Sequence, residues 1–266
     1  MTVSTLPLAE LSNRELANLY AHALKDIPPS LLAGFSEGDR GGLSGLYLPA
    51  IPDGYWQAAT RVMIVGRETR GWGVVPKDEV CGDLTAYIER SIALQKKFQA
   101  DHIGQLPDAK ATFYNLARQV AKRCGQSGVV VGNLFCIAHQ KTIPTASGRY
   151  VEILRYSEIL LKLQIELLRP HIVIFANGSS SAAQRRAFFP TKGNNKVCFN
   201  GRYFLKDGIS KNHLWAFEMN GMQCYRVHHP SSLHRKKADN ARRFLMTLLP
   251  GSDTNAAVSA PMASSL

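Results

Sequence analysis

The sequence predicts a three-layer α/β/α protein, in which helices enclose a central, mainly four-stranded parallel sheet that carries a β-hairpin insertion. Four short apolar runs have the length and composition of buried parallel strands, at residues 62–65, 129–131, 171–175 and 224–227. Helical patterns separate most of these runs, and strands that alternate with helices are typical of a parallel sheet.

The helices are predicted from end signals and from apolar residues at helical spacing. Ser12-Asn-Arg-Glu15 is a capping box that starts a helix reaching about residue 24, and Pro28-Pro29 ends it. No regular element is expected over residues 28–56, which are rich in Gly and Pro. Asp83 caps a helix to about residue 99, and further helices are expected at 109–123, 151–168, 177–188 and 238–249.

Residues 190–223 form a predicted basic insertion before the last strand of the core. Asn200-Gly201 and Asn220-Gly221 each lie between β-like runs, and Asn-Gly is the strongest short signal for a hairpin turn. Residues 251–266 are rich in Gly, Ser and Ala, so we expect a disordered tail there.

Composition favours a polyanionic partner. The net charge of +12 on 266 residues points to nucleic acid ahead of a membrane surface, although a merely solvated basic surface gives the same count. The N-terminus lacks a basic region followed by an apolar stretch, so we expect no signal peptide. No window approaches 18 uninterrupted apolar residues, so we expect a cytoplasmic protein that does not enter a membrane. The five cysteines form no CxxC pair, which indicates reduced thiols and neither a disulfide framework nor a metal cluster. No His, Cys and Asp residues have metal-binding spacing, so we expect no metal, and we expect no cofactor.

Two loops that follow apolar runs carry the candidate chemistry. One is Gly66-Arg67-Glu68-Thr69, and the other is His228-His229-Pro230-Ser231-Ser232. Because the carboxyl ends of parallel strands meet at one edge of a sheet, these loops are expected to face each other. One would bring a carboxylate and the other an imidazole.

The order of four motifs over residues 60–248 resembles that of the uracil-DNA glycosylase superfamily. The most specific match is His229-Pro230-Ser231-Ser232-Leu233, for the family's His-Pro-Ser-Pro-Leu. Gly66-Arg67-Glu68-Thr69 stands where the family has Gly-x-(Asp or Asn)-Pro, and Val131-Gly132-Asn133-Leu134 fits its asparagine strand. The run from Ile174 to Ser179 fits its third strand and small-residue helix start.

The resemblance implies a role for each matched residue. A base inside a duplex must be flipped into a pocket before its glycosidic bond can be cleaved. Glu68 would stabilise the positive charge on the sugar and orient the attacking water, while His229 would donate a hydrogen bond to the departing base. Asn133 would read the pyrimidine edge, and Leu233 would fill the gap in the base stack.

Further contacts are assigned on the same grounds. The expected base-binding residues are Gly66, Arg70, Trp72 and Asn133. The expected DNA-binding residues are Ser179, Ser231, Ser232, Leu233, Arg235, Lys236 and Lys237.

Each assignment has a structural alternative. Glu68 could be a surface carboxylate paired with Arg67 or Arg70, Asn133 could close a turn, and Trp72 could belong to the core. His229 and Leu233 could be structural, the basic run 235–237 could be a solvated face, and His213 and His228 are expected to be structural.

Three departures from the family bear on the substrate. Glutamate is one methylene longer than aspartate, and Thr69 replaces the expected proline. Arg70 occupies the place where the uracil-specific branch carries a tyrosine that screens the C5 position of the ring, so a pyrimidine with a C5 substituent could enter. The four spaced cysteines of the iron–sulfur branches are absent, so no iron–sulfur cluster is expected.

These observations predict that residues 1–250 form a single glycosylase-like domain that acts as a monomer. The expected activity is that of a monofunctional DNA glycosylase, which hydrolyses the N-glycosidic bond of a pyrimidine and leaves an abasic site. A C5-modified pyrimidine, such as a hypermodified cytosine of phage DNA, is favoured as substrate in antiviral defence, with uracil in base-excision repair as the alternative. A non-catalytic nucleic-acid-binding module on the same scaffold, or an enzyme acting on free nucleotides or small phosphorylated substrates, also stays open.

Overall fold

The computed structural model describes residues 10–32, 42–69, 71–75, 82–105, 112–230 and 235–251. Its contacts divide the chain into two compact units. The first unit comprises residues 1–51, 67–100 and 132–169, and the second comprises residues 52–66, 101–131 and 170–266.

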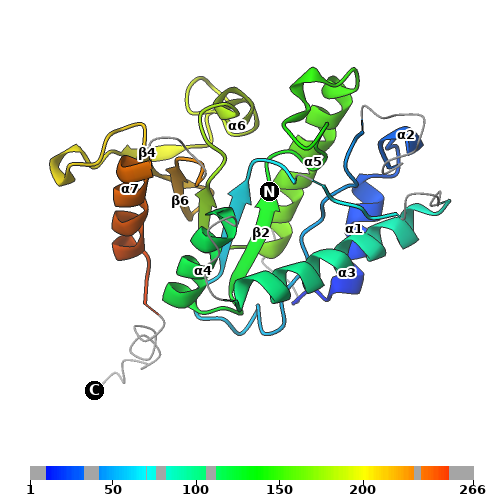
Figure 1. Cartoon of the computed structure of the whole chain (residues 1–266), viewed down its shortest axis with the longest axis horizontal. Coiled ribbons are helices and arrows are strands. Elements are labelled where there is room, and N and C mark those ends of the chain that lie inside the picture. The colour runs from blue at the N-terminus through cyan, green and yellow to red at the C-terminus, as the bar shows by residue number, and fades with distance from the viewer. Residues whose placement is uncertain are drawn as a thin grey trace, which may run out of the picture. The chain divides into compact units, whose positions relative to one another are not determined.

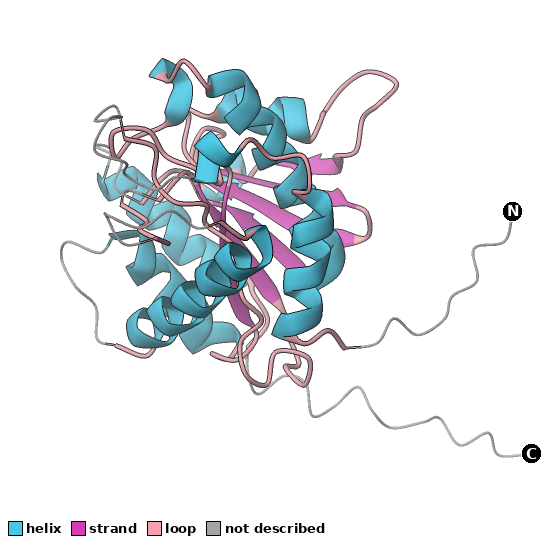
Figure 2. Cartoon of the chain, turned by 90° about the vertical axis from the view of Figure 1, so that its right-hand side faces the viewer, coloured by secondary structure: helices cyan, strands magenta, loops and turns pink. Residues whose placement is uncertain are grey.

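A six-stranded sheet has the order β2-β1-β3-β6-β5-β4, and all of it except the last two residues of β2 belongs to the second unit (Figures 1 and 2). β1 pairs parallel with β3, and β3 pairs parallel with β6, whereas β5 is antiparallel to both β6 and β4. The mixed α/β class with a core of mainly parallel strands is thereby confirmed. The strands are β1 Val62–Gly66, β2 Val129–Asn133, β3 Ile172–Phe175, β4 Phe199–Arg202, β5 Leu214–Met219 and β6 Met222–Val227.

Both faces of the central strands are buried, which explains their continuous apolar runs. On one face, Val62 and Ile64 belong to a core cluster with residues of α4 (Thr112–Cys124) and α7 (Arg235–Leu248). On the other face, the ring of Phe175 lies 5.4 Å from that of Phe189, the residue that follows α6 (Ala182–Phe188).

Of the two hairpin turns predicted at Asn-Gly pairs, the structure has one. Asn220 and Gly221 both have positive φ, at 49° and 77°, and they form the tight turn of the predicted hairpin between β5 and β6. The hairpin predicted at Asn200-Gly201 is wrong, because this pair lies inside β4, where the register with β5 is irregular. Gly201 is needed for close approach there, since a Cβ atom would lie 2.9 Å from Nε1 of Trp215.

The helices of the first unit begin and end close to the predicted limits. α1 (Asn13–Ala23) has the predicted capping box at Ser12, and Asp83 accepts hydrogen bonds from the first turn of α3 (Leu84–Ile103). α5 (Tyr150–Leu168) ends on Arg169 in the left-handed conformation. The short α2 (Pro29–Leu32) lies in a stretch for which no element was expected, with its proline at the start of the helix.

Single 3-10 turns occur at Pro144–Ala146 and Leu205–Asp207. Of the predicted tail, only Gly251 lies among the described residues. No helix in the described ranges is long and apolar enough to cross a membrane.

Candidate functional site

In the second unit, the carboxyl ends of β1, β3 and β6 meet at one edge of the sheet. Val65 is paired with Phe175, and Phe175 is paired with Arg226, so the three strands end together. The amide of Ala176 donates a hydrogen bond of 2.8 Å to the carbonyl of Val65. Gly66, which ends β1, the turn 176–181 and residues 228–230 therefore lie at a common edge of the sheet.

His229 is held against the turn that follows β3. Gly178 has φ of +76°, and a Cβ atom built on it would lie 3.0 Å from the Cβ of His229. Only a glycine can combine this left-handed backbone with such a close neighbour. The turn thus fixes the position of the His229 backbone, which the sequence placed in the site. Because of this turn, α6 begins at Ala182 and not at residue 177, where its start was predicted.

Asn177, at the start of the same turn, was missed as a site residue. Its side chain is fully buried, and neither its amide nitrogen nor its oxygen has a hydrogen-bond partner among the described residues. The hydroxyl of Ser181 donates to the backbone carbonyl of Asn177 at 2.7 Å. A buried amide with donor and acceptor both unused is suited to a polar ligand, because leaving it unpaired is costly.

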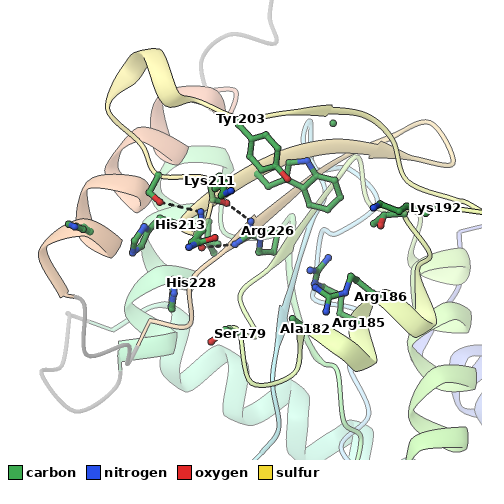
Figure 3. Close-up of a pocket in the computed structure, with 18 residues that line it drawn as sticks. Ser179, Ala182, Arg185, Arg186, Lys192, Tyr203, Lys211, His213, Arg226 and His228 are labelled. Atoms are coloured by element: carbon green, nitrogen blue, oxygen red, sulfur yellow. Dashed lines mark hydrogen bonds between the residues drawn. The ribbon is translucent and has the colours of Figure 1, made fainter.

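A basic cavity of about 1010 Å³ opens beside this turn, within the second unit (Figure 3). The predicted DNA-binding residues Ser179 and Lys237 line it. Six of its eighteen lining residues are Lys or Arg, and none of the eighteen is Asp or Glu. The cationic side chains are Arg185, Arg186, Lys192, Lys211, Arg226 and Lys237.

Two arginines of this cavity are desolvated. Arg185, on α6, is only 4% exposed, and its Nε and Nη1 have no hydrogen-bond partner within the described part of the chain. Burial, with the charges of Arg226 and Arg186 next, lowers the pKa of Arg185 to about 10. Arg226, on β6, donates to the carbonyl oxygens of Asn212 and Lys211 at 2.5 and 2.6 Å, and burial lowers its pKa as well.

The histidines expected to be structural also contribute to the cavity wall. The rings of His213 and His228 lie 5.0 Å apart at 30°, and both residues line the cavity. No local pattern in the sequence indicated this contact, because His213 belongs to the insertion and the pairing of β5 with β6 brings it beside His228.

In the first unit, the Glu68 carboxylate is held by its neighbour in sequence. Arg67 donates from Nε to Oε2 at 2.5 Å and from Nη2 to Oε1 at 3.0 Å. The side chain of Glu68 is only 2% exposed, so the pairing foreseen with Arg67 occurs in a buried setting and not at the surface.

Asn133 and Trp72 belong to the same unit. Asn133 ends β2 and is partly buried, and the amide of Phe135 donates to the carbonyl of Arg67 at 2.9 Å, which joins this stretch to the Glu68 loop. Trp72 is 7% exposed and packs edge-on against Tyr47 and Phe98. This is the core environment that was considered for Trp72 as the alternative to a base-binding role.

Several assigned residues have no described geometry. Arg70, Ser231, Ser232 and Leu233 lie outside the described residues, and for Arg235 only the backbone at the start of α7 is described. Lys236 is exposed on the first turn of α7.

No group of three or more His, Cys, Asp and Glu side chains able to hold a metal ion occurs in the described ranges. The cysteines that the structure describes are buried free thiols, and burial raises the pKa of Cys124 to about 11 and that of Cys136 to about 12. Neither a scan against protein-family models nor a search of curated proteins found a match to this chain.

Proposed function

We propose that this protein is a monofunctional DNA glycosylase that hydrolyses the N-glycosidic bond of a pyrimidine in DNA and leaves an abasic site. The observation that carries the proposal is the edge of the sheet in the second unit. There a histidine is fixed against the turn after β3, beside a cavity with six cationic and no acidic side chains. Such a cavity suits a polyanion, and the histidine suits the developing charge on a departing base.

His229 is assigned to the base and Glu68 to the sugar. As the bond breaks, the pyrimidine takes the electron pair of the glycosidic bond, and a donor at its carbonyl oxygen stabilises that charge. The Glu68 carboxylate stabilises the positive sugar and accepts a hydrogen bond from the attacking water. Each carboxylate oxygen has a second lone pair, so the Arg67 contacts leave it able to accept this bond. The water oxygen bonds to C1′ of the sugar, and the proton that the water loses neutralises the departing base anion.

The favoured substrate is a C5-modified pyrimidine such as a hypermodified cytosine of phage DNA, which would make the enzyme part of antiviral defence. This preference rests on Arg70, where the resembled family has its C5 screen, and on the basic insertion. Uracil in base-excision repair is the alternative. We further propose that the enzyme acts as a cytoplasmic monomer and uses no metal or cofactor.

A second candidate function is nucleic-acid binding without catalysis. The burial and pairing of Glu68 favour this function, because its side chain is 2% exposed and both carboxylate oxygens accept hydrogen bonds from Arg67. A carboxylate in this state has part of its field cancelled by the guanidinium, which weakens its effect on a positive sugar.

Base release measured by mass spectrometry separates the two functions. The purified protein is incubated with unmodified DNA, uracil-containing DNA and phage DNA with modified cytosines. We expect one base to be released, with loss of release in Glu68→Gln and in His229→Ala. Glu89→Gln, which removes an exposed carboxylate on α3, is the matched control and should retain release.

Two results would contradict the glycosylase proposal. One is release that continues unchanged in both Glu68→Gln and His229→Ala. The other is no release from any DNA while tight binding is retained, which would favour the binding module.

A further inference from the structure

The cavity of the second unit holds more positive charge than the described residues that line it neutralise. Its eighteen lining residues include six Lys or Arg and no carboxylate (Figure 3). These cations come from separate segments, since Arg185 and Arg186 lie on α6, Arg226 on β6 and Lys237 on α7. The fold therefore gathers like charges around one space, which repel one another unless an anion enters.

Arg185 is the most informative member of this group. It is only 4% exposed, lines the cavity, and has Nε and Nη1 without a partner among the described residues. The ring of Trp215 lies on one side of it, with the ring centroid 6.0 Å from the guanidinium carbon. Buried charged groups are normally paired, so the missing partner indicates a ligand that carries negative charge.

Arg226 contributes in a different way. Its guanidinium is fixed by the carbonyl oxygens of Asn212 and Lys211, which are neutral acceptors. These bonds hold the 211–213 segment in the wall of the cavity but cancel none of the charge. Arg185 is thus left as the inner donor for an anion, and Lys192 is an exposed cation of the same wall.

The size of the cavity and its aromatic residues indicate a ligand larger than one phosphate. A volume near 1010 Å³ equals the upper range of small-molecule pockets. Six cations exceed the two negative charges of a single phosphate. Tyr203, which is 51% exposed, lies 6.5 Å from Trp215 with rings 28° from parallel, and exposed aromatic rings in basic grooves stack nucleic-acid bases.

We infer that this cavity is a binding site for consecutive phosphates of a single DNA strand, with Arg185 as its inner contact and Tyr203 as a stacking surface. None of the residues assigned from the sequence included Arg185, Arg226 or Tyr203. The choice of DNA over another phosphate-bearing chain rests on the proposed function, whereas the anion site itself stands on the cavity.

The test measures binding of a fluorescent strand of twelve deoxyadenosines by anisotropy over a series of salt concentrations. This strand holds no pyrimidine, so its binding is independent of base excision. Arg185→Met removes the buried charge and keeps an apolar chain, and Lys192→Met removes an exposed cation of the cavity. Lys122→Met, on the exposed side of α4, changes the net charge equally and is the matched control.

We expect Arg185→Met to weaken binding by about 10- to 100-fold, as for removal of a charge-assisted hydrogen bond. The slope of log affinity against log salt should fall by about 0.7 for each phosphate of the strand that is no longer neutralised. Lys192→Met should lower the slope with a smaller loss of affinity, whereas Lys122→Met should change affinity by less than about threefold. Binding unchanged in both cavity variants would overturn the inference.

Two further measurements make the outcome specific. Arg185→Met should unfold at the same temperature as the wild type or higher, because it removes an unpaired buried charge. Inorganic tripolyphosphate is the probe for a free polyphosphate, and tighter binding of tripolyphosphate than of the strand would overturn the assignment to DNA. Arg185-dependent strand binding without base release from any DNA would refute the glycosylase proposal and leave this one standing.

Discussion

The contact between Gly178 and His229 allows a sharp test of how the turn after β3 positions the site. Gly178→Ala introduces two separate costs. The backbone at φ of +76° is left-handed, which disfavours any side chain by about 1–2 kcal/mol. The new Cβ atom would also lie 3.0 Å from the Cβ of His229, where an ordinary carbon contact is about 3.5–4.0 Å.

Gly208→Ala separates these costs. Gly208 has φ of +73°, nearly the same strain, but a Cβ atom there would have no neighbour within 4 Å. We expect Gly208→Ala to lower the free energy of unfolding by about 1–2 kcal/mol and to leave activity unchanged. Gly178→Ala should cost about 1–3 kcal/mol more, the range for an added methyl group in a packed place.

The difference in activity is the decisive part. To restore an ordinary contact, His229 must move by about 0.5–1 Å, and a displacement of 1 Å in a site can cost about 100-fold in rate. Base release from the DNA that the wild type cleaves should therefore fall by about 10- to 100-fold in Gly178→Ala. Urea unfolding of both variants gives the stability differences. Equal release by Gly178→Ala and Gly208→Ala would refute the argument that the turn positions His229.

Three further predictions concern separate features. Arg67→Gln leaves the buried Glu68 carboxylate without its bidentate partner and should lower the free energy of unfolding by about 3–5 kcal/mol. In a double-mutant cycle, adding Glu68→Gln should restore most of that free energy, whereas additive losses would contradict the pairing. Burial, and then the charge of Arg61, lower the pKa of His171 below its usual 6.5. As the pH drops below about 6.5, the imidazole of His171 is therefore protonated more readily in the unfolded chain than in the folded one, and the free energy of unfolding falls. In urea unfolding at a series of pH values, His171→Gln should lose less stability below a pH of about 6.5 than the wild type does. An equal loss in both proteins would show that His171 does not cause the pH dependence. Ser12→Ala removes the capping box of α1 and should cost about 1 kcal/mol in thermal unfolding, whereas Ser12→Gly should cost only a few tenths.

The central strands were predictable because burial on both faces leaves a simple mark in the sequence. The run at β1 consists of apolar side chains followed by glycine, and all five residues are buried. The start of α6 was placed too early for an equally local reason. Gly178 and the residues beside it resemble a helix start in composition, but the positive φ of Gly178 keeps them in a turn.

The cavity was not predictable in the same way. Arg185 lies in a short predicted helix and is followed by another arginine, and such a pattern usually indicates a solvated surface. Its neighbours in the cavity wall include Tyr203, Trp215 and Arg226, which come from the insertion and from β6. Those residues are 18 to 41 positions further along the chain, beyond the reach of any local pattern. The basic character of the insertion was visible in the sequence, but not which of its residues would line the cavity.

The charge of the cavity makes opposite predictions for the free and the bound protein. In the free protein, Arg185, Arg186 and Arg226 repel one another; burial first, and then the charges of Arg226 and Arg186, lower the pKa of Arg185. Added salt screens this repulsion, so it should raise the stability of the free protein while it weakens the binding of a DNA strand. A merely solvated basic surface with a net charge of +12 also repels itself, so salt would stabilise the folded protein in that case too. The two cases differ in Arg185→Met: a built anion site loses a repulsion that salt screens, so the stabilisation by salt should be smaller in this variant than in the wild type, whereas a general excess of positive charge should give equal stabilisation in both.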